Sequence, residues 1–177
     1  MVEVTDAEVT AVGRSVFEAV MRLLISGIPG TGKTTFARWL EEEHAYRRCS
    51  RDELNGAQFL HCVEHALSAA DHVVIDWGFV ASDPGFSVDF PVVQRLVNEF
   101  AFEHWWFDGD RHAALASFLS RGTVVREAWD AQLAGIERHW AEIAVYFSGR
   151  ILNVVSDGPR YAAQEEILAS LMAVQPE

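Results

Sequence analysis

The feature that most constrains this chain is a glycine-rich stretch between an apolar run and an apolar-periodic segment. It reads Gly27-Ile28-Pro29-Gly30-Thr31-Gly32-Lys33-Thr34-Thr35, which has the form G-x-x-x-x-G-K-[ST]. Glycines at this spacing let the backbone curl so that successive N–H groups point at phosphate oxygens. The following helix would add the positive end of its dipole at the same place. A strand, a phosphate-binding loop and a helix are therefore predicted in that order.

Two side chains of this loop have predicted roles of their own. Lys33 is expected to reach the β- and γ-phosphates of a nucleotide, and the Thr34 hydroxyl is expected to bind Mg²⁺. A simple Gly/Pro turn is the alternative. The flanking strand and helix patterns disfavour it, because they are the context that the motif requires. All nine residues from Gly27 to Thr35 are thus predicted to contact the phosphates of ATP.

The composition narrows the protein class. Half of the 177 residues are apolar, so we expect one compact domain over residues 1–177. No apolar run approaches the roughly 20 residues that span a bilayer, and the N-terminus carries acidic residues instead of a basic signal. The two cysteines, Cys49 and Cys62, show no metal or redox spacing in the sequence. A cytoplasmic location is the resulting expectation.

The net charge argues against a polynucleotide partner. The chain has 14 Lys+Arg against 26 Asp+Glu, for a net charge of −12, and Lys33 is its only lysine. Proteins that bind a polynucleotide along its length need a continuous basic surface, because neutralising the backbone phosphates supplies most of the binding affinity. An extended surface that binds nucleic acid is therefore not expected. A small site that binds an anion is still compatible with this net charge.

Apolar runs alternate with helix-periodic segments along the chain. Strands are predicted at 22–26, 46–49, 73–76, 102–107 and 151–155. Helices are predicted at 6–19, 33–43, 91–100, 111–120, 126–147 and 162–174. A further helix is predicted to start with Ser50 as its N-cap. This alternation indicates an α/β domain with a doubly wound parallel sheet.

Two acidic residues follow predicted strands near the phosphate loop. Asp76 ends the apolar run Val73-Val74-Ile75, an arrangement in which a Walker B carboxylate holds Mg²⁺. A strand-end acid that caps a loop is the alternative. Asp52 follows the second strand, where a carboxylate can take the proton from an attacking hydroxyl. A helix-capping role is the equal alternative, because acids are favoured in a first helical turn.

Three segments together resemble a known group of kinases. Gly27 to Thr35, then Ser50-Arg51-Asp52-Glu53, then Val73 to Phe79 are similar to the polynucleotide-kinase-like group of P-loop kinases. Its wider relatives include zeta-toxin-like, gluconate and adenylate kinases. The resemblance implies a five-stranded parallel sheet of order 2-3-1-4-5 with a small helical lid at about 110–130. It also implies that Asp52 is the general base.

The chain departs from this group at one position, and the resemblance implies roles for three further residues. The group has an arginine three residues after the base, where this chain has Asn55, which again disfavours polynucleotides. Arginines in the lid of this group close over the phosphates. The resemblance implies that Arg121 is the first candidate for this role and Arg126 the second. A surface ion pair is the alternative for each. The loop after the fifth strand runs past the adenine and implies a contact at Gly158.

The leading hypothesis is an Mg²⁺-dependent kinase that moves the γ-phosphate of ATP to a hydroxyl of a small molecule. A nucleoside or nucleoside-monophosphate kinase is the second, with Arg47, Arg48 and Arg51 available for an acceptor phosphate. A regulatory nucleotide-binding NTPase without a small-molecule acceptor is the third. A homodimer is a further expectation, with the predicted helix at 6–19 as its surface.

Overall fold

The computed structural model describes residues 21–54, 56–70, 72–78, 90–122, 124–147, 150–156 and 161–173. The helix predicted at 6–19, with the dimer surface expected on it, lies outside the described residues. Asn55 and Gly158 lie outside them as well.

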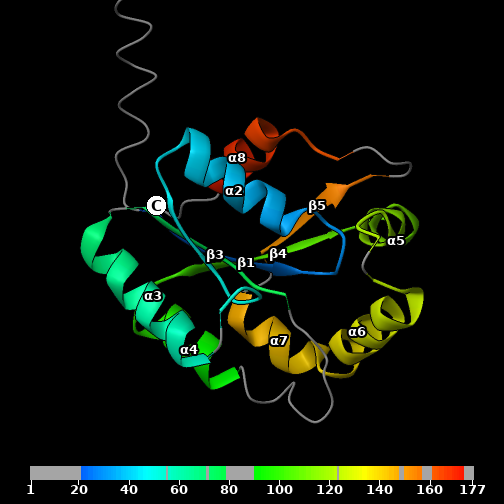
Figure 1. The fold of residues 1–177 in the computed structure, drawn as a ribbon, viewed down its shortest axis with the longest axis horizontal. Helices are drawn as coiled ribbons and strands as arrows, with labels where there is room; N and C mark the ends of the chain where they lie inside the picture. Colours follow the sequence, from blue (N-terminus) through cyan, green and yellow to red (C-terminus); the bar gives the residue numbers. More distant parts are fainter. Residues whose placement is uncertain are drawn as a thin grey trace, which may run out of the picture.

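Five parallel strands form the central sheet (Figure 1). Their order is β2-β3-β1-β4-β5, which confirms the predicted fold class and topology. Apolar runs suit such strands because helices cover both faces of a parallel sheet. The strands are β1 (Arg22–Gly27), β2 (Arg47–Ser50), β3 (Val73–Asp76), β4 (Glu103–Gly109) and β5 (Ile151–Val155).

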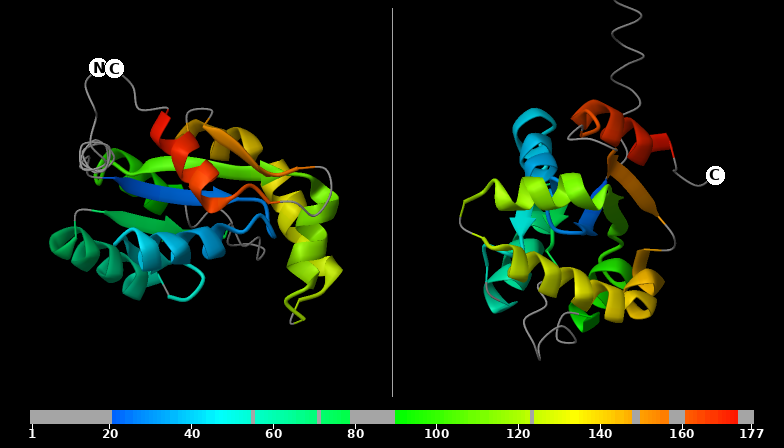
Figure 2. Two further views of the ribbon diagram at one scale, coloured as in Figure 1. Left: turned by 90° about the horizontal axis from the view of Figure 1, so that it is seen from above. Right: turned by 90° about the vertical axis from the view of Figure 1, so that its right-hand side faces the viewer.

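Helices cover both faces of the sheet. In Figure 1, α2 and α8 lie on one face, and α3, α4 and α7 lie on the other. Figure 2 shows α5 and α6 at the end of the sheet where β1 passes into the phosphate loop. The helices are α2 (Lys33–Glu43), α3 (Gly56–Ala69), α4 (Phe90–Asn98), α5 (Arg111–Leu119), α6 (Arg126–Arg138), α7 (Trp140–Phe147) and α8 (Gln164–Ala173).

The two faces of the sheet carry separate hydrophobic cores. Phe36 and Leu40 of α2 pack with Leu171 of α8 in one core. Phe59 of α3 and Ile143 of α7 belong to the other. Burial of both faces fixes the sheet, and the parallel strands end at one edge, where ligands of such sheets bind.

The single helix predicted over 126–147 is wrong, because the chain forms two helices there. α6 ends at Arg138, and His139 leaves helical geometry with φ −103° and ψ 13°. The break lets the Trp140 ring pack edge-on against the ring of Trp106 in β4, with 5.1 Å between ring centroids. Trp106 is fully buried and Trp140 partly so, and the contact between the two rings stabilises this arrangement of the chain.

The helix start predicted at Ser50 is also wrong. Ser50 is the last residue of β2, and α3 begins only at Gly56. Residues 51–54 form a turn, in which the Arg51 backbone N–H donates to the Asp76 carbonyl at 3.1 Å. Asp52 therefore does not cap a helix, which removes the alternative explanation of its position.

None of the helices in the described ranges combines the length and the apolar character needed to cross a membrane.

Candidate active site

The phosphate loop follows β1 without interruption and presses against neighbouring backbone. Gly27 and Gly30 have φ of 145° and 88°, a region that favours glycine. A Cβ atom would overlap the Phe107 carbonyl at Gly27 and the Ala114 carbonyl at Gly30. The Ile28 N–H also donates to the Phe107 oxygen at 3.1 Å. The glycines of the motif are thus required by close packing as well as by the curl of the loop.

Three successive carbonyls of this loop accept hydrogen bonds from side chains. Thr31 Oγ1 donates to the Ile28 oxygen at 2.9 Å. Trp129 Nε1 of α6 donates to the Pro29 oxygen at 3.2 Å, and the Tyr161 hydroxyl donates to the Gly30 oxygen at 2.5 Å. The carbonyl and N–H of a trans peptide unit point in opposite directions. The N–H groups that follow the last two carbonyls therefore point away from Trp129 and Tyr161.

Lys33 lies at the centre of the charged groups around the loop. Its Nζ donates to the carbonyl oxygens of Gly27 at 3.0 Å and Ile28 at 2.8 Å. Burial lowers the pKa of Lys33 to about 8. The charges of Asp52 and Asp76 act to raise this pKa, and the charge of Arg121 acts to lower it. The fold thus brings the predicted base, the predicted metal ligand and a lid arginine within electrostatic reach of one ammonium.

Asp52 lies in the turn after β2 and faces the end of β3. The Gly78 backbone N–H donates to its carboxylate, and a Cβ at Gly78 would lie 2.8 Å from Oδ2. Water reaches Asp52, yet the surrounding protein atoms desolvate the carboxylate and raise its pKa. The charge of Lys33 acts in the opposite direction, and that of Asp76 adds to the increase. A carboxylate with a raised pKa is a better proton acceptor than an ordinary surface acid.

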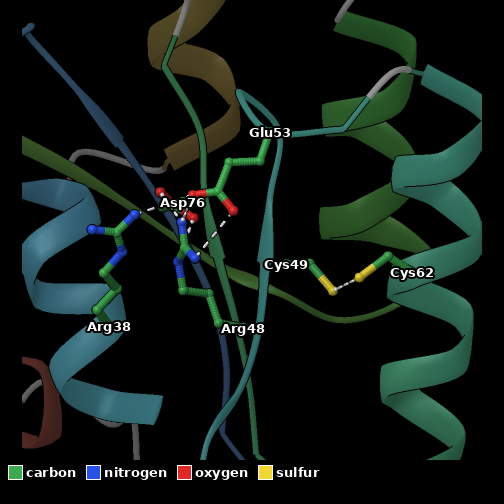
Figure 3. A network of polar contacts seen from close by, with 6 residues as sticks. All are labelled: Arg38, Arg48, Cys49, Glu53, Cys62 and Asp76. Atoms are coloured by element: carbon green, nitrogen blue, oxygen red, sulfur yellow. Dashed lines mark hydrogen bonds and ion pairs between the residues drawn. The ribbon is translucent and has the colours of Figure 1, made fainter. Parts of the chain in front are cut away.

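Asp76 is buried at the end of β3 and takes part in an ion-pair network (Figure 3). Arg48 of β2 donates from Nε to Oδ1 at 3.1 Å and from a terminal nitrogen to Oδ2 at 3.3 Å. The same guanidinium pairs with Glu53 at 2.7 Å, and Arg38 of α2 reaches Glu53 at 3.4 Å. Both carboxylate oxygens of Asp76 are therefore already engaged by one arginine.

Protein groups near the loop could supply some of the ligands of Mg²⁺, and the phosphates of a substrate would supply others. Thr34 lies in the first turn of α2, and Asp76 ends the strand that pairs directly with β1. Within the described ranges, no three His, Cys, Asp or Glu side chains are grouped closely enough to hold a metal. Protein-bound Mg²⁺ usually has one or two carboxylates and completes its shell with phosphate oxygens and water. One hydroxyl and one carboxylate beside a phosphate loop match that pattern.

The segment in which a lid was predicted contains α5, a break and α6. Gly122 in the break has φ 71°. Arg121 is exposed beside it, with its guanidinium 5.5 Å from the centre of the Phe118 ring. Arg126 pairs with Asp130 at 3.5 Å, and both side chains are more than half exposed. Of the two predicted lid arginines, Arg121 lies near enough for its charge to lower the pKa of Lys33, and Arg126 forms the surface ion pair that was its alternative.

Comparison with known proteins adds information about the fold. No protein-family model matches the chain, and no curated protein matches it. A solved structure of a gluconokinase from Sinorhizobium meliloti 1021 is 14% identical and covers 88% of this chain and 91% of its own, with a TM-score of 0.52. A shikimate kinase from Bacteroides thetaiotaomicron is 14% identical and covers 88% of this chain and 96% of its own, with a TM-score of 0.50. The chain has the P-loop kinase fold.

The P-loop kinase fold of this chain has a pocket beside the phosphate loop. Its volume is about 480 Å³, and it lies between the start of α2, α5 and the segment that leads into α8. The Tyr161 ring lies 3.6 Å from the position of a Cβ on Gly32. The residues that line the pocket include Thr35, Phe36, Ser117, Tyr161 and Ile167.

Three residues of the candidate site were not predicted in their observed roles. Arg48 was considered for an acceptor phosphate, but it pairs with Asp76 and Glu53. Trp129 and Tyr161 hold loop carbonyls that lie 100 and 131 residues away in the sequence. For Arg48, an arginine on the strand next to Asp76 was a usable signal. The other two contacts depend on how α6 and the segment after β5 meet the loop.

Proposed function

We propose that this protein is an Mg²⁺-dependent kinase that transfers the γ-phosphate of ATP to a hydroxyl of a small molecule. The observation that carries the proposal is the convergence on Lys33 of Asp52, Asp76 and Arg121, which come from three separate segments. A phosphate loop alone supports nucleotide binding. A desolvated carboxylate and a lid arginine beside it are the parts that phosphoryl transfer needs.

The phosphates of ATP would be held by the loop backbone and Lys33. The N–H groups of Gly30 and Thr31 belong to peptide units whose carbonyls accept from Trp129 and Tyr161. These tethers orient the amides in advance, so less reorganisation is needed during the reaction. Arg121 would add positive charge from the lid. Positioning and charge stabilisation account for most of the rate in this reaction class.

Thr34 and Asp76 would hold the metal. Bound Mg²⁺ would supply charge neutralisation at the phosphates. Arg48 donates one hydrogen bond to each oxygen of Asp76, so each oxygen would still have a lone pair for the metal or for water bound to it. The Thr34 hydroxyl, at the start of α2, would be the second protein group that holds the metal.

Asp52 would accept the proton from the acceptor hydroxyl. Its raised pKa favours proton uptake, and the charge of Lys33 limits the increase. The nucleoside of ATP would occupy the pocket of about 480 Å³ beside Thr35 and Tyr161. The acceptor would then approach from the side of β2 and β3, where Asp52 and Gly78 lie.

The charges around the site favour a small alcohol as acceptor. Arg48 is engaged by Asp76 and Glu53, and Arg51 donates to the Leu54 carbonyl at 3.0 Å. Two of the three arginines that an acceptor phosphate would need are therefore in use within the protein. The net charge of −12 disfavours a polynucleotide. The two structures similar in fold are named as kinases of gluconate and shikimate, which is in keeping with a small-molecule acceptor.

An acceptor screen tests this function. Purified protein is incubated with Mg·ATP and a panel of sugars, sugar acids, polyols, nucleosides, nucleoside monophosphates and short 5′-hydroxyl oligonucleotides. Mass spectrometry then detects the gain of one phosphate, and ADP release is measured in parallel. We expect phosphorylation of a non-nucleotide alcohol. Phosphorylation of nucleosides or their monophosphates alone would contradict the proposal, as would ATP hydrolysis that no acceptor stimulates.

A further inference from the structure

The two cysteines of this chain are 13 residues apart in sequence, on two consecutive elements, and adjacent in the fold. Cys49 of β2 is 1% exposed, and Cys62 of α3 is partly buried. Their sulfur atoms lie 2.7 Å apart (Figure 3). Non-bonded heavy atoms are most stable at about 3.5–4.0 Å, whereas the two sulfurs of a disulfide are about 2.05 Å apart. The pair is thus closer than ordinary packing requires.

The alternation of β2 explains why the two sulfurs meet. Successive strand residues point to opposite faces of the sheet. Arg48 points toward Asp76 and α2, so Cys49 points toward α3, as Figure 3 shows. Both cysteines adjoin the core that contains Phe59. Packing of α3 on β2 therefore holds the two thiols together in the folded protein.

We propose that Cys49 and Cys62 are a site of reversible oxidation, which a small disulfide such as oxidised glutathione converts into an intramolecular disulfide between β2 and α3. The closed ring contains the turn of residues 51–54, which carries Asp52. Oxidation would therefore join the two elements on either side of that turn by a covalent bond. The site is independent of the kinase function proposed above.

The chemistry has a definite order because the two thiols differ in exposure. The Cys62 thiolate, which solvent reaches, attacks one sulfur of the small disulfide, and one small thiolate leaves. The Cys49 thiol then gives up its proton and attacks the Cys62 sulfur, which expels the second small thiol. Two protein thiols are oxidised and one small disulfide is reduced to two thiols. Burial, together with the contact to Cys62, raises the pKa of Cys49, which makes it the second nucleophile instead of the first.

The test uses the full chain and does not involve ATP. The protein is incubated with oxidised glutathione, quenched with acid and analysed by intact mass and thiol titration. Because the chain has only 2 cysteines, an intramolecular disulfide has one assignment. Trypsin cleaves at Arg51, between the two cysteines, so the linked peptides identify the bond directly.

We expect loss of two hydrogens in the intact mass, no free thiol, and full reversal by dithiothreitol. Closing a ring of this size raises the melting temperature of a domain of this length by about 5–10 °C. Two free thiols after treatment, dimers linked between chains, or a final product with glutathione still attached would overturn the proposal.

Two single variants test the order of attack. Cys49→Ala should accumulate a mixed disulfide of glutathione on Cys62, because the second nucleophile is missing. Cys62→Ser should leave the buried Cys49 thiol unmodified under native conditions. Rapid glutathionylation of Cys49 in Cys62→Ser would contradict the assigned order. Alkylation after unfolding confirms in each case that the remaining thiol is intact.

Discussion

The proposed nucleotide side and the proposed acceptor side of this site are specified in different ways. The nucleotide side is one continuous stretch, Gly27 to Thr35, whose glycines fit against the carbonyls of Phe107 and Ala114. The acceptor side is assembled from β2, β3 and the turn after β2, joined by the pairing of Arg48 with Asp76 and Glu53. A glycine-rich loop that binds through its backbone can be recognised in a sequence. A network of side chains from separate strands forms only when those strands are paired.

The two sides should therefore fail in different ways when they are changed. Substitutions on the nucleotide side should remove function and leave the fold intact wherever the side chain points to a phosphate. Substitutions in the acceptor-side network should reduce stability first.

Lys33→Met should give the largest loss of activity. It removes the ammonium that Asp52, Asp76 and Arg121 all influence. Loss of one preorganised charge donor lowers turnover by about 100- to 1,000-fold. The measurement is acceptor-dependent ADP release, with the melting temperature as the check on folding. Arg38→Met is the control on the same helix, since its side chain is 58% exposed. Equal losses in both variants would show that the effect is not specific to the loop.

Arg48→Met should mainly reduce stability. The side chains of Arg48 and Asp76 are 9% and 2% exposed, so the substitution leaves a buried carboxylate without its cation. Breaking one partner of a buried ion pair lowers the free energy of unfolding by about 3 kcal/mol, or roughly 6–12 °C in melting temperature. Thermal unfolding measures the change. Arg38→Met should change the free energy by less than about 0.5 kcal/mol, because its pair with Glu53 is on the surface.

The affinity for ATP should fall as the pH rises through the pKa of Lys33. Burial lowers this pKa to about 8 in the protein alone, and bound phosphates would raise it again because they favour the charged form. Above pH 8, binding must therefore take up a proton, and affinity should fall by up to about tenfold for each pH unit. Calorimetry in buffers of different ionisation enthalpy measures both effects. In Lys33→Met the affinity should stay level, and a pH dependence that persists there would point to another group.

Trp129→Phe should have the smallest effect. It keeps an aromatic ring in α6 but removes the hydrogen bond from Nε1 to the Pro29 carbonyl. Loss of one such bond weakens nucleotide binding by about 1 kcal/mol, or roughly fivefold. The KM for ATP should rise while the KM for the acceptor is unchanged. An effect on the acceptor instead would show that α6 serves the other side of the site.

Some helices and strands are determined by the short stretch of sequence that forms them. The predicted bounds of β3, β5 and α2 agree with the structure, because each follows from a compact apolar pattern or from the motif itself. The start of α3 was misplaced. Ser50 followed by acidic residues is typical of a helix start, but the pairing of Arg51 N–H with the Asp76 carbonyl extends β2 into a turn.

The remaining misses depend on contacts between different elements of the fold. The break at His139 follows from the packing of Trp140 on Trp106. The meeting of Cys49 and Cys62 follows from the packing of α3 on β2. The predicted convergence of Asp52 and Asp76 near the loop rested on topology, because the carboxyl ends of parallel strands meet at one edge. Topology places residues in a neighbourhood, but it does not say which of them pair.

The most direct test of the account is transfer to the acceptor by Asp52→Asn. Single-turnover experiments with Mg·ATP and the acceptor found in the screen measure the phosphorylated product, and calorimetry measures ATP binding. Glu53→Gln is the matched control, because the charge of Glu53 is paired with Arg48 on the outside of the turn. We expect Asp52→Asn to bind ATP like the unchanged protein but to lose transfer by about 100- to 10,000-fold, whereas Glu53→Gln stays within about tenfold. Transfer by Asp52→Asn at the rate of the unchanged protein would contradict the account.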